Sequence, residues 1–347
     1  MSLIVLKNIM SQIDLQSALS ILKSDGVVGM PTETVYGLAG NIYSDEALKK
    51  IFSTKERPFF DPLIVHVAQI EQAKELVLNW TKAMDVLAKK FWPGPLTLVL
   101  EKNNRVSDLI TSGLTTVGLR MPRHALALKL ISEFGFPLAA PSANKFGKTS
   151  PTSAEHVRLE FKNEGVFVLD GGECEVGVES TVLYVHQTSD ESEVSLEILR
   201  AGHIVLSEII EALDEHNLKI KTGPKKEKVS APGQMKHHYM PKKPLVFLDD
   251  GVDLHCSINQ IQNLIKELPD LVESVNIIKP KKIESFRELV LSDKPDEAAR
   301  MLYASLREVS KGSEDILFFK KKEIHRGEHW EAVLDRLGKA ATIKIEK

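Results

Sequence analysis

The sequence predicts an α/β protein with two domains. Apolar residues occur alternately at helical spacing and in short strand-like runs, and many runs end in polar, Gly- or Pro-marked turns. The 347 residues exceed the usual length of one domain, and 43% are apolar while 27% are charged, as in ordinary globular proteins. No run approaches the roughly 20 consecutive apolar residues of a membrane span, so no membrane partner is expected.

The first half of the chain alternates helix signals with strand signals. Apolar residues at helical spacing in 15–22 follow a predicted N-cap at Asp14, and Ser44 is expected to cap a second helix. Thr152 and Glu155 have the spacing of a capping box for a later helix. Strand-like runs are found at 27–30, 63–67, 96–100, 116–119, 136–140, 166–169, 180–185 and 196–199. This order indicates a mixed α/β organisation.

The composition changes after a predicted helix near 207–216. The following residues, 217–244, are rich in Lys, Pro and Gly and poor in apolar side chains, which is typical of a linker. A strand signal at 245–248 then opens a second α/β unit, with helices expected near 257–267, 296–309 and 329–337. The predicted organisation is a first domain at 1–207, a linker at 208–244 and a C-terminal domain at 245–347.

Cysteine content and charge narrow the classes of function. Cys174 and Cys256 lie far apart in the sequence, and neither has a CxxC partner. We therefore expect neither a disulfide framework nor a cysteine zinc site, and we expect a cytoplasmic location. The net charge of −3 argues against a protein that binds nucleic acid over its whole surface. Residues 101–150 hold seven Lys and Arg against three Asp and Glu, whereas 151–200 hold three against eleven. Residues 101–150 are therefore the first place where we expect an anionic ligand to bind.

Two polar clusters follow predicted helices and strands near the start of the chain. In PTETVYGLAG, residues 31–40, hydroxyls and a carboxylate follow a strand end, a position where open α/β sheets bind ligands. A hydrogen-bonded turn with Tyr36 in the core is the alternative. Lys55 and Arg57 alternate before Pro58, so an extended segment would direct both cations to one side and suit a polyphosphate. A solvated basic turn explains this pair equally well.

Two further clusters carry charged and hydroxyl side chains. Arg120 ends the predicted strand in TTVGLRMPRH, where either a bound anion or a structural ion pair would explain it. The segment PLAAPSANKFGKTSPT is rich in small residues that allow a backbone to approach a ligand. Gly147-Lys148-Thr149 within it resembles the end of a Walker A loop, but the first required glycine falls at Ser142. A P-loop is therefore rejected, and the pair His237-His238 is too weak a pattern to assign a metal site.

Taken in order, these clusters closely resemble the threonylcarbamoyl-AMP synthase family, in its long form with a YrdC-like catalytic domain and a C-terminal extension. The matching segments are PTETVYGL, the Lys-x-Arg of Lys55 and Arg57, DPLIVHV, WPGPLTLVL, VGLRMPRH, the Ser-x-Asn of Ser142 and Asn144, GVESTV and ILRAG. They run from about residue 25 to 203, and SAPGQMKHHYMP and DRLGKAA extend the resemblance into the long form. The chain departs from it at Phe60-Asp61, where the family often has Asp-Asn, and at Gly233-Gln234.

The resemblance implies both a fold and a reaction. The fold would be a YrdC-like twisted mixed sheet with flanking helices and a concave basic cavity, followed by a smaller Rossmann-like α/β domain. The enzyme would be a nucleotidyltransferase that converts L-threonine, bicarbonate and ATP, accompanied by Mg²⁺, to threonylcarbamoyl-AMP and pyrophosphate. A separate tRNA threonylcarbamoyl transferase complex would use the product to modify tRNA. No protein ligand for a metal is assigned.

The resemblance also assigns residues to two substrates. The L-threonine positions are Thr32, His66, Arg120, Ala140 and Ser180. The nucleotide positions are Lys55, Arg57, Asp61, Thr116, Ser142, Asn144, Ser150, Arg200 and Pro232. Lys55 and Arg57 are also expected to be catalytic, because fixed cations allow a carbamate anion to attack a phosphate. Arg120 would pair with the threonine carboxylate, and the linker at 231–233 would close over the nucleotide and exclude water.

Two other functions remain open at this point. The cations in 101–150 would suit a module that binds RNA weakly and performs no chemistry, although the net charge and the uncharged Ser-Ala-Asn loop count against it. A P-loop-like or carbamoyltransferase-associated NTPase is the weaker alternative. The C-terminal domain has no motif with obvious chemistry, so we expect it to support a lid or dock a partner.

Overall fold

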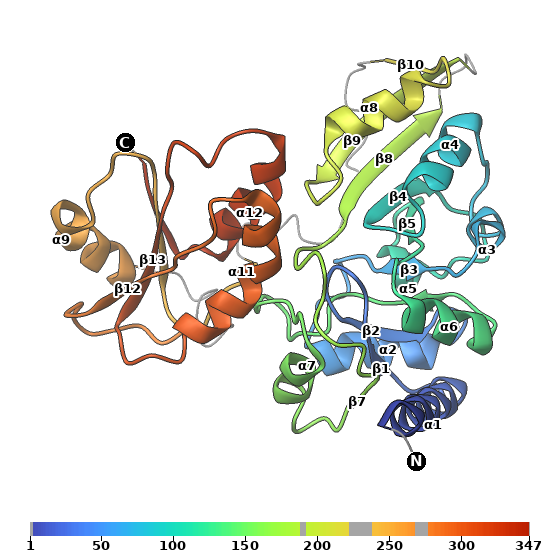
Figure 1. Cartoon of the computed structure of the whole chain (residues 1–347), viewed down its shortest axis with the longest axis horizontal. Helices are drawn as coiled ribbons and strands as arrows, with labels where there is room; N and C mark the ends of the chain where they lie inside the picture. The colour runs from blue at the N-terminus through green and yellow to red at the C-terminus, as the bar shows by residue number, and fades with distance from the viewer. Residues whose placement is uncertain (1–2, 188–191, 222–237, 268–276, 347) are drawn as a thin grey trace. The chain divides into compact units, whose positions relative to one another are not determined.

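The computed structural model describes residues 3–187, 192–221, 238–267 and 277–346, which form two compact units (Figure 1). The first unit comprises Met1–Lys145, Pro151–Glu175 and Glu179–Gln234. The second comprises Phe146–Ser150, Val176–Val178 and Met235–Lys347. Pro232 and the linker at 231–233, which was expected to close over the nucleotide, lie outside the described residues, as does the side chain of Cys256.

The first unit is built on a ten-stranded mixed sheet, so the predicted α/β class with a mixed sheet is confirmed. Its strand order is β10-β9-β8-β4-β5-β3-β6-β2-β1-β7. Parallel pairs such as β3–β5 and β4–β8 alternate with antiparallel pairs such as β4–β5 and β8–β9. The strands are β1 (Val28–Met30), β2 (Gly37–Asn41), β3 (Ile64–His66), β4 (Leu96–Glu101), β5 (Thr116–Arg120), β6 (Leu138–Ala139), β7 (Phe167–Val168), β8 (Thr181–Gln187), β9 (Glu193–Arg200) and β10 (Lys219–Ile220).

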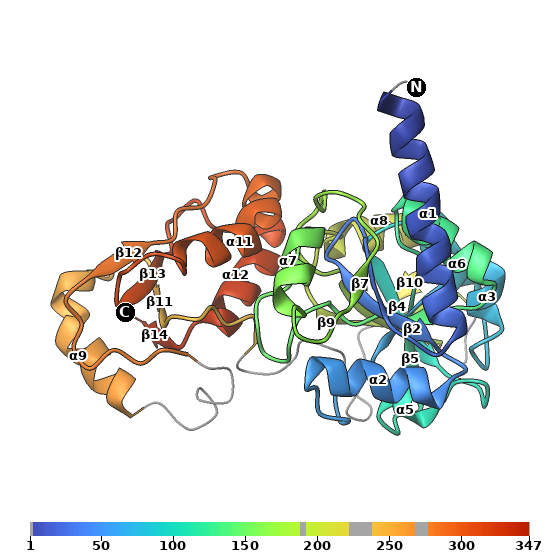
Figure 2. The ribbon, with the colours of Figure 1, turned by 90° about the horizontal axis from the view of Figure 1, so that it is seen from below.

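Helices cover the sheet of the first unit, and α1 packs along α6 (Figure 2). They are α1 (Leu3–Lys23), α2 (Asp45–Lys55), α3 (Ile70–Lys74), α4 (Lys82–Phe91), α5 (Asp108–Thr111), α6 (Ala125–Phe134), α7 (Ala154–Glu160) and α8 (Leu206–Asp214). Ser44 caps α2 as predicted, because its side chain accepts a hydrogen bond from the Ala47 backbone N–H at 3.1 Å. Among the described residues, each helix is too short or too polar to cross a membrane.

Two predicted helix starts were wrong. The first helix begins at Leu3, so Asp14 lies inside it and is not an N-cap. The cap of α7 is Ser153, whose hydroxyl accepts from the His156 backbone N–H at 3.3 Å. Thr152 does not close a capping box, because its own backbone N–H donates to the His156 ring at 3.2 Å.

The central strands of the first unit present different residues on their two faces. Val65, Leu98 and Leu119 share the main hydrophobic core with Leu183. Since successive side chains of a strand point to opposite faces, the residues between them face away from this core. That second face carries His66, Thr97, Thr116, Arg120 and Val182, so the predicted site residues of β3 and β5 share one side of the sheet.

The second unit has a four-stranded sheet in which every pair is parallel, with the order β12-β13-β11-β14. The strands are β11 (Leu245–Leu248), β12 (Phe286–Glu288), β13 (Ile316–Lys320) and β14 (Ile343–Ile345), and the helices are α9 (Leu254–Lys266), α11 (Pro295–Val309) and α12 (Glu328–Ala340). Helix α9 packs on one face of this sheet, and α11 and α12 lie on the other (Figure 1). A smaller Rossmann-like α/β domain is thereby confirmed.

The compact units of the structure do not coincide with the predicted domains, which were a first domain at 1–207, a linker at 208–244 and a C-terminal domain at 245–347. Helix α8 packs on α4, and β10 extends the large sheet by pairing with β9, so both elements belong to the first unit. Two short internal segments, 146–150 and 176–178, belong to the second unit. Composition did not indicate either feature, because both depend on contacts between residues that are distant in sequence.

Candidate active site

Lys55 and Arg57 are buried together at the end of α2. The prediction that they lie on one extended segment was wrong: Lys55 is the last residue of the helix, and Glu56 adopts a left-handed conformation with φ 52°. The Glu56 N–H bonds back to the Phe52 and Ser53 carbonyls, which ends the helix. This turn, instead of strand alternation, directs both cations inward. Their exposed fractions are 1% and 7%, so a solvated basic turn is excluded.

The Lys55 ammonium is held by neutral backbone oxygens. Its Nζ donates to the carbonyls of Ser142 and Asn144, each at 2.5 Å. Burial lowers the pKa of Lys55 well below its ordinary value of 10.5, and the neighbouring charge of Arg57 lowers it further. Lys55 therefore ties the Ser-Ala-Asn loop to the end of α2, as expected if both bind one ligand.

Three cations surround the Asp61 carboxylate. Arg57 pairs with it at 2.9 Å and also donates to the Asp61 and Pro62 carbonyls at 3.1 and 2.8 Å. Burial raises the pKa of Asp61, while the charges of Arg57, Lys55 and Arg200 oppose that rise. Three cations close to one another suit a polyphosphate, which brings several negative charges.

Arg200 connects this cation group to the beginning of β8. Its Nε and Nη2 donate to the carbonyl and hydroxyl oxygens of Ser180, each at 3.1 Å. The Ser180 hydroxyl also lies 2.7 Å from the Thr97 hydroxyl. Ser180, expected at the threonine, thus contacts a residue expected at the nucleotide. Thr116 lies on the same sheet face and lines a narrow crevice with Thr97, Ile64, Gly118 and Val182.

A buried ion pair joins the PTETVYGL segment to the end of β5. Arg120 Nη2 lies 2.8 Å from Glu33 Oε2, and Arg120 Nε donates to the Gly94 carbonyl at 3.3 Å. Glu33 Oε1 accepts no hydrogen bond from the described residues. Sequence reasoning noted a carboxylate here but gave Glu33 no role. The available signal was its position in an otherwise apolar and hydroxyl-bearing segment, because a buried charge requires a partner.

His66 and Cys174 lie near this ion pair. His66 is the register partner of Arg120 between β3 and β5. Burial and the charge of Arg120 lower the pKa of His66 to about 3, so its ring is neutral at pH 7. Burial raises the pKa of the Cys174 thiol, which also lies near enough to sense the charges of Glu33 and Arg120. Two neighbours of the pair, the His66 ring and the Cys174 thiol, are therefore uncharged at pH 7.

Thr32 and Ala140 shape the backbone around the pair. The Thr32 hydroxyl donates to the Val35 carbonyl at 2.6 Å and accepts the Thr34 and Val35 N–H groups at 3.2 Å. It therefore builds the hydrogen-bonded turn considered as an alternative for this segment. The Ala140 N–H donates to the Ile64 carbonyl at 3.0 Å, which fixes the strand end beside β3.

Ser150 belongs to the second unit, with Gly147-Lys148-Thr149 just before it. The nearest following helix, α7, starts only at Ala154, and Lys148 forms a β-bridge with Met240. In a P-loop the helix begins directly at the GK[ST] residues. The structure therefore agrees with the rejection of a P-loop NTPase.

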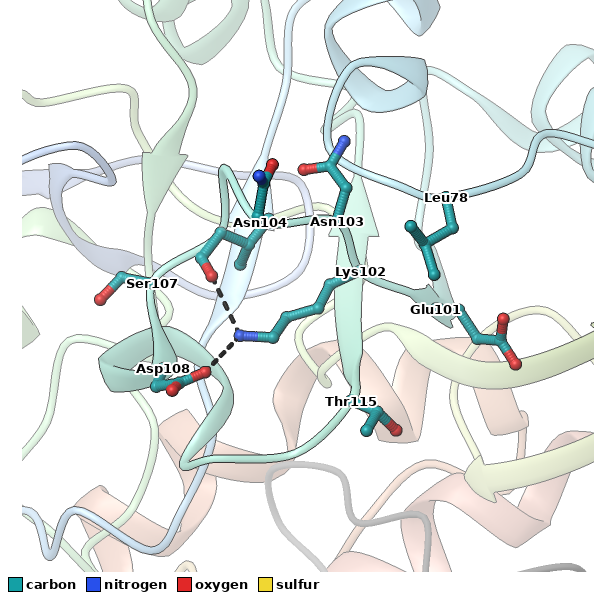
Figure 3. Close-up of a pocket in the computed structure, with 9 residues that line it drawn as sticks. Leu78, Glu101, Lys102, Asn103, Asn104, Ser107, Asp108 and Thr115 are labelled. Atoms are coloured by element: carbon teal, nitrogen blue, oxygen red, sulfur yellow. Dashed lines mark hydrogen bonds and ion pairs between the residues drawn. The ribbon is translucent and has the colours of Figure 1, made fainter.

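A separate open hollow of about 720 Å³ lies where β4 ends and β5 begins, at the end of β5 that is opposite to Arg120 (Figure 3). It is lined by Leu78, Glu101, Lys102, Thr115 and, from the loop after β4, Asn103, Asn104, Val106, Ser107 and Asp108. Lys102 points across it, and its Nζ bonds to the Asp108 carboxylate at 2.5 Å and the Val106 carbonyl at 3.0 Å. No residue assigned to threonine or nucleotide lines this hollow. Its cation is already paired, so it does not match the expected anion site.

Comparisons with known proteins show the family of this chain. The family model described as "Telomere recombination" matches residues 20–202, and the model described as "Threonylcarbamoyl-AMP synthase, C-terminal domain" matches residues 204–342. A threonylcarbamoyl-AMP synthase of Pyrococcus abyssi is 38% identical over 331 residues, which cover 95% of this chain and 94% of the relative. The chain belongs to the threonylcarbamoyl-AMP synthase family.

Other relatives of the family give the same result. A Bacillus subtilis threonylcarbamoyl-AMP synthase is 41% identical over 251 residues, covering 72% of this chain and 69% of the relative. The crystal structure of Pyrococcus abyssi Sua5 complexed with L-threonine superposes with a TM-score of 0.75 at 35% identity and covers 96% of both chains. The function of this chain is that of a threonylcarbamoyl-AMP synthase, an ATP-using enzyme that serves tRNA modification.

Proposed function

We propose that the two buried charge groups on one sheet face are the two halves of the active site. ATP phosphates would bind at Lys55, Arg57 and Arg200, and L-threonine would bind at the Glu33–Arg120 pair. The observation that carries this proposal is the Glu33–Arg120 contact of 2.8 Å, in which both side chains are buried. A zwitterionic amino acid has one cation and one anion, and this pair presents the complementary charges.

Threonine would bind by contacting both members of the Glu33–Arg120 ion pair. Its carboxylate would take the remaining donors of Arg120, and its ammonium would face Glu33 Oε1, which accepts no hydrogen bond from the described residues. His66 would contribute a neutral ring, which avoids repelling the ammonium. The bound complex would therefore keep local charge balanced, as a buried site requires.

The chemistry then needs a proton transfer, a condensation with bicarbonate and a displacement at phosphorus. The ammonium gives its proton to Glu33, and the free amine attacks the carbon of bicarbonate to form a carbamate with release of water. A carbamate oxygen attacks the α-phosphorus of ATP, and the bond from that phosphorus to the bridging oxygen breaks to release pyrophosphate. Lys55 and Arg57 stabilise the negative charge that builds up on the phosphates. Holding both substrates in place supplies much of the remaining rate.

We assign Mg²⁺ to the ATP and not to a protein site. Mg²⁺ commonly binds through one or two carboxylates together with substrate phosphates. Throughout the described ranges, no three His, Cys, Asp or Glu side chains gather in a way that could hold a metal ion. We further propose a cytoplasmic enzyme, consistent with a chain of only two cysteines, whose product passes to a tRNA threonylcarbamoyl transferase complex.

Pyrophosphate release tests this proposal directly. With ATP, bicarbonate and Mg²⁺ present, release should depend on L-threonine, and serine or alanine should replace it poorly. Equal activity with alanine, or no requirement for bicarbonate, would contradict the substrate assignment. Salt-sensitive RNA affinity that persists at saturating ATP would instead favour the RNA-binding alternative.

A further inference from the structure

Two short segments from the middle of the chain are packed into the C-terminal unit. Phe146–Ser150 follows the Ser-Ala-Asn loop, and Val176–Val178 precedes Glu179 and Ser180. Both segments are joined at each end to residues of the first unit. Their backbone conformations therefore reach the proposed site through covalent continuity.

The segment Phe146–Ser150 is held mainly through its backbone. The Met240 N–H donates to the Gly147 carbonyl at 2.8 Å, and Lys148 and Met240 form a parallel β-bridge. The Thr149 hydroxyl lies 3.3 Å from the carbonyls of Tyr239 and Met240. Arg307 of α11 donates through Nη2 to the Thr149 carbonyl. The carbonyl next to Ser150 is thus held by a charged donor.

The residues that receive this segment are themselves tightly packed. The Tyr239 ring lies 5.6 Å from the Tyr303 ring of α11, and the Arg336 guanidinium of α12 lies 5.5 Å from the centre of the Tyr239 ring. Arg336 is fully buried and pairs with Asp335 at 2.7 Å. Tyr239 has φ 64°, a conformation that a bulky side chain keeps only when its surroundings hold it. The surface that receives the segment is therefore closely packed.

The segment Val176–Val178 lies directly against the backbone of α11. Gly177 has φ 80°, and a Cβ built there would be 2.4 Å from Arg300 Cα and 2.6 Å from the Arg300 carbonyl oxygen. Only glycine allows this approach. Arg300 and Arg307 are seven residues apart, close to two helical turns, so both contacts are made on the same side of α11.

We propose that α11 is a positioning element for both substrates, with Arg307 as the positioning residue for the nucleotide loop and Gly177 as the residue that sets Ser180. This inference rests on the proposed function and adds a role for the C-terminal unit. Arg307 fixes the peptide between Thr149 and Ser150, at a predicted nucleotide position. Gly177 lies three residues before Ser180, at a predicted threonine position. The two contacts should therefore affect different substrates.

Arg307→Ala in the full-length protein should raise the KM for ATP about tenfold, because one charge-assisted hydrogen bond is lost. The KM for threonine should stay within about twofold, and kcat at saturating ATP within about threefold. Arg307→Lys should recover part of the ATP affinity, since an ammonium still donates to the carbonyl. Arg326→Ala is the matched control, because Arg326 is exposed and pairs only loosely with Glu323, at 3.6 Å.

Gly177→Ala should raise the KM for threonine about tenfold with a smaller change for ATP. Gly113→Ala is its control: Gly113 has a similar φ of 78°, but a Cβ there would meet no atom within 4 Å. Gly113→Ala therefore introduces the same backbone strain as Gly177→Ala, but without a steric clash such as the one with Arg300.

These variants separate failure of the inference from failure of the proposed function. If the wild type shows no threonine-dependent pyrophosphate release, the proposed function is wrong. If the wild type is active but Arg307→Ala and Gly177→Ala keep both KM values, or change both equally, α11 does not position the substrates. If circular dichroism shows that Arg307→Ala does not fold, Arg307→Lys and Gly177→Ala test the inference instead. A change in the KM of one substrate only supports the inference, whereas wild-type KM values or equal changes in both overturn it.

Discussion

Lys55 and Arg120 are both buried cations at the end of a regular element, but different partners hold them. Two backbone carbonyls receive the Lys55 ammonium, whereas a carboxylate, Glu33, receives the Arg120 guanidinium. Carbonyl oxygens orient a charge without cancelling it, and a carboxylate cancels it. Burial accordingly lowers the pKa of Lys55, which disfavours its charged form until an anion offsets the charge. A bound anion would therefore stabilise the Lys55 group, while the Glu33 carboxylate already offsets the charge of Arg120.

This difference indicates which substrate each group can accept. A polyphosphate brings several negative charges and would be favoured by the cations Lys55, Arg57 and Arg200 near Asp61. A zwitterion brings no net charge and would suit the Glu33–Arg120 pair. The two groups meet through Ser180, which bonds to Arg200 and to Thr97 on the face that also carries Arg120. Variants that alter one group should therefore affect one substrate more than the other.

The largest effect is expected from Lys55→Met, which keeps the side-chain length and removes the charge. Threonine-dependent pyrophosphate release should fall on the order of a hundred- to a thousandfold, because a fixed cation at the phosphates is lost. Steady-state kcat/KM for ATP is the measurement. Lys49→Met on the exposed side of the same helix is the control and should retain wild-type activity. Wild-type kcat/KM in Lys55→Met would remove Lys55 from the catalytic group.

Glu33→Gln should act mainly on threonine. It keeps the side-chain shape but leaves the buried Arg120 charge without its partner, which typically costs about 3 to 5 kcal/mol of unfolding free energy. We expect a KM for threonine raised about a hundredfold, a lower kcat because the proton acceptor is lost, and a reduced Tm. The control is Glu75→Gln, which breaks only the exposed pair with Arg105. An unchanged KM for threonine would exclude Glu33 from amine recognition.

A smaller effect is expected for the pH dependence of stability at His66. Its pKa is about 3 in the folded protein and about 6.5 when unfolded, so the unfolded state binds the proton first as pH falls. Stability is therefore lost as pH falls from about 6.5 towards 3, at up to about 1.4 kcal/mol per pH unit from this residue. Urea unfolding of His66→Gln between pH 7 and 4.5 should give a shallower pH dependence than the wild type. Parallel curves would contradict a neutral buried ring.

The sequence predicted the class of fold and most strands, because the central strands have clear apolar runs between turn residues. It also predicted Arg120 at a strand end, where the apolar run stops before Met121-Pro122. It did not predict how Lys55 and Arg57 are directed inward, since the left-handed Glu56 is not a glycine and gives no local signal. Glu33 was overlooked for a related reason: its partner lies 87 positions further along the chain.

The membership of Ser150 in the second unit shows a similar limit. Its neighbour Thr149 bonds to Tyr239 and Arg307, which are about 90 and 158 residues away. Helical spacing and turn composition report only on neighbours within a few residues. The family motifs predicted Ser150 as a nucleotide-binding residue, but only the fold shows that Ser150 belongs to the C-terminal unit.

The smallest effect is expected from Thr116→Val, which tests where the nucleotide extends beyond its phosphates. Thr116 is 9% exposed and lines the crevice with Thr97 and Gly118, on the sheet face that carries Arg120. The valine keeps the shape of threonine and removes one hydroxyl, so a neutral hydrogen bond to the nucleotide would be lost. The KM for ATP should rise about three- to tenfold with the KM for threonine unchanged, measured by pyrophosphate release. Thr115→Val, at the hollow of Figure 3, is the adjacent control. If both variants matched the wild type, the nucleotide would have to lie closer to Arg200 and Asp61 than to the Thr116 crevice.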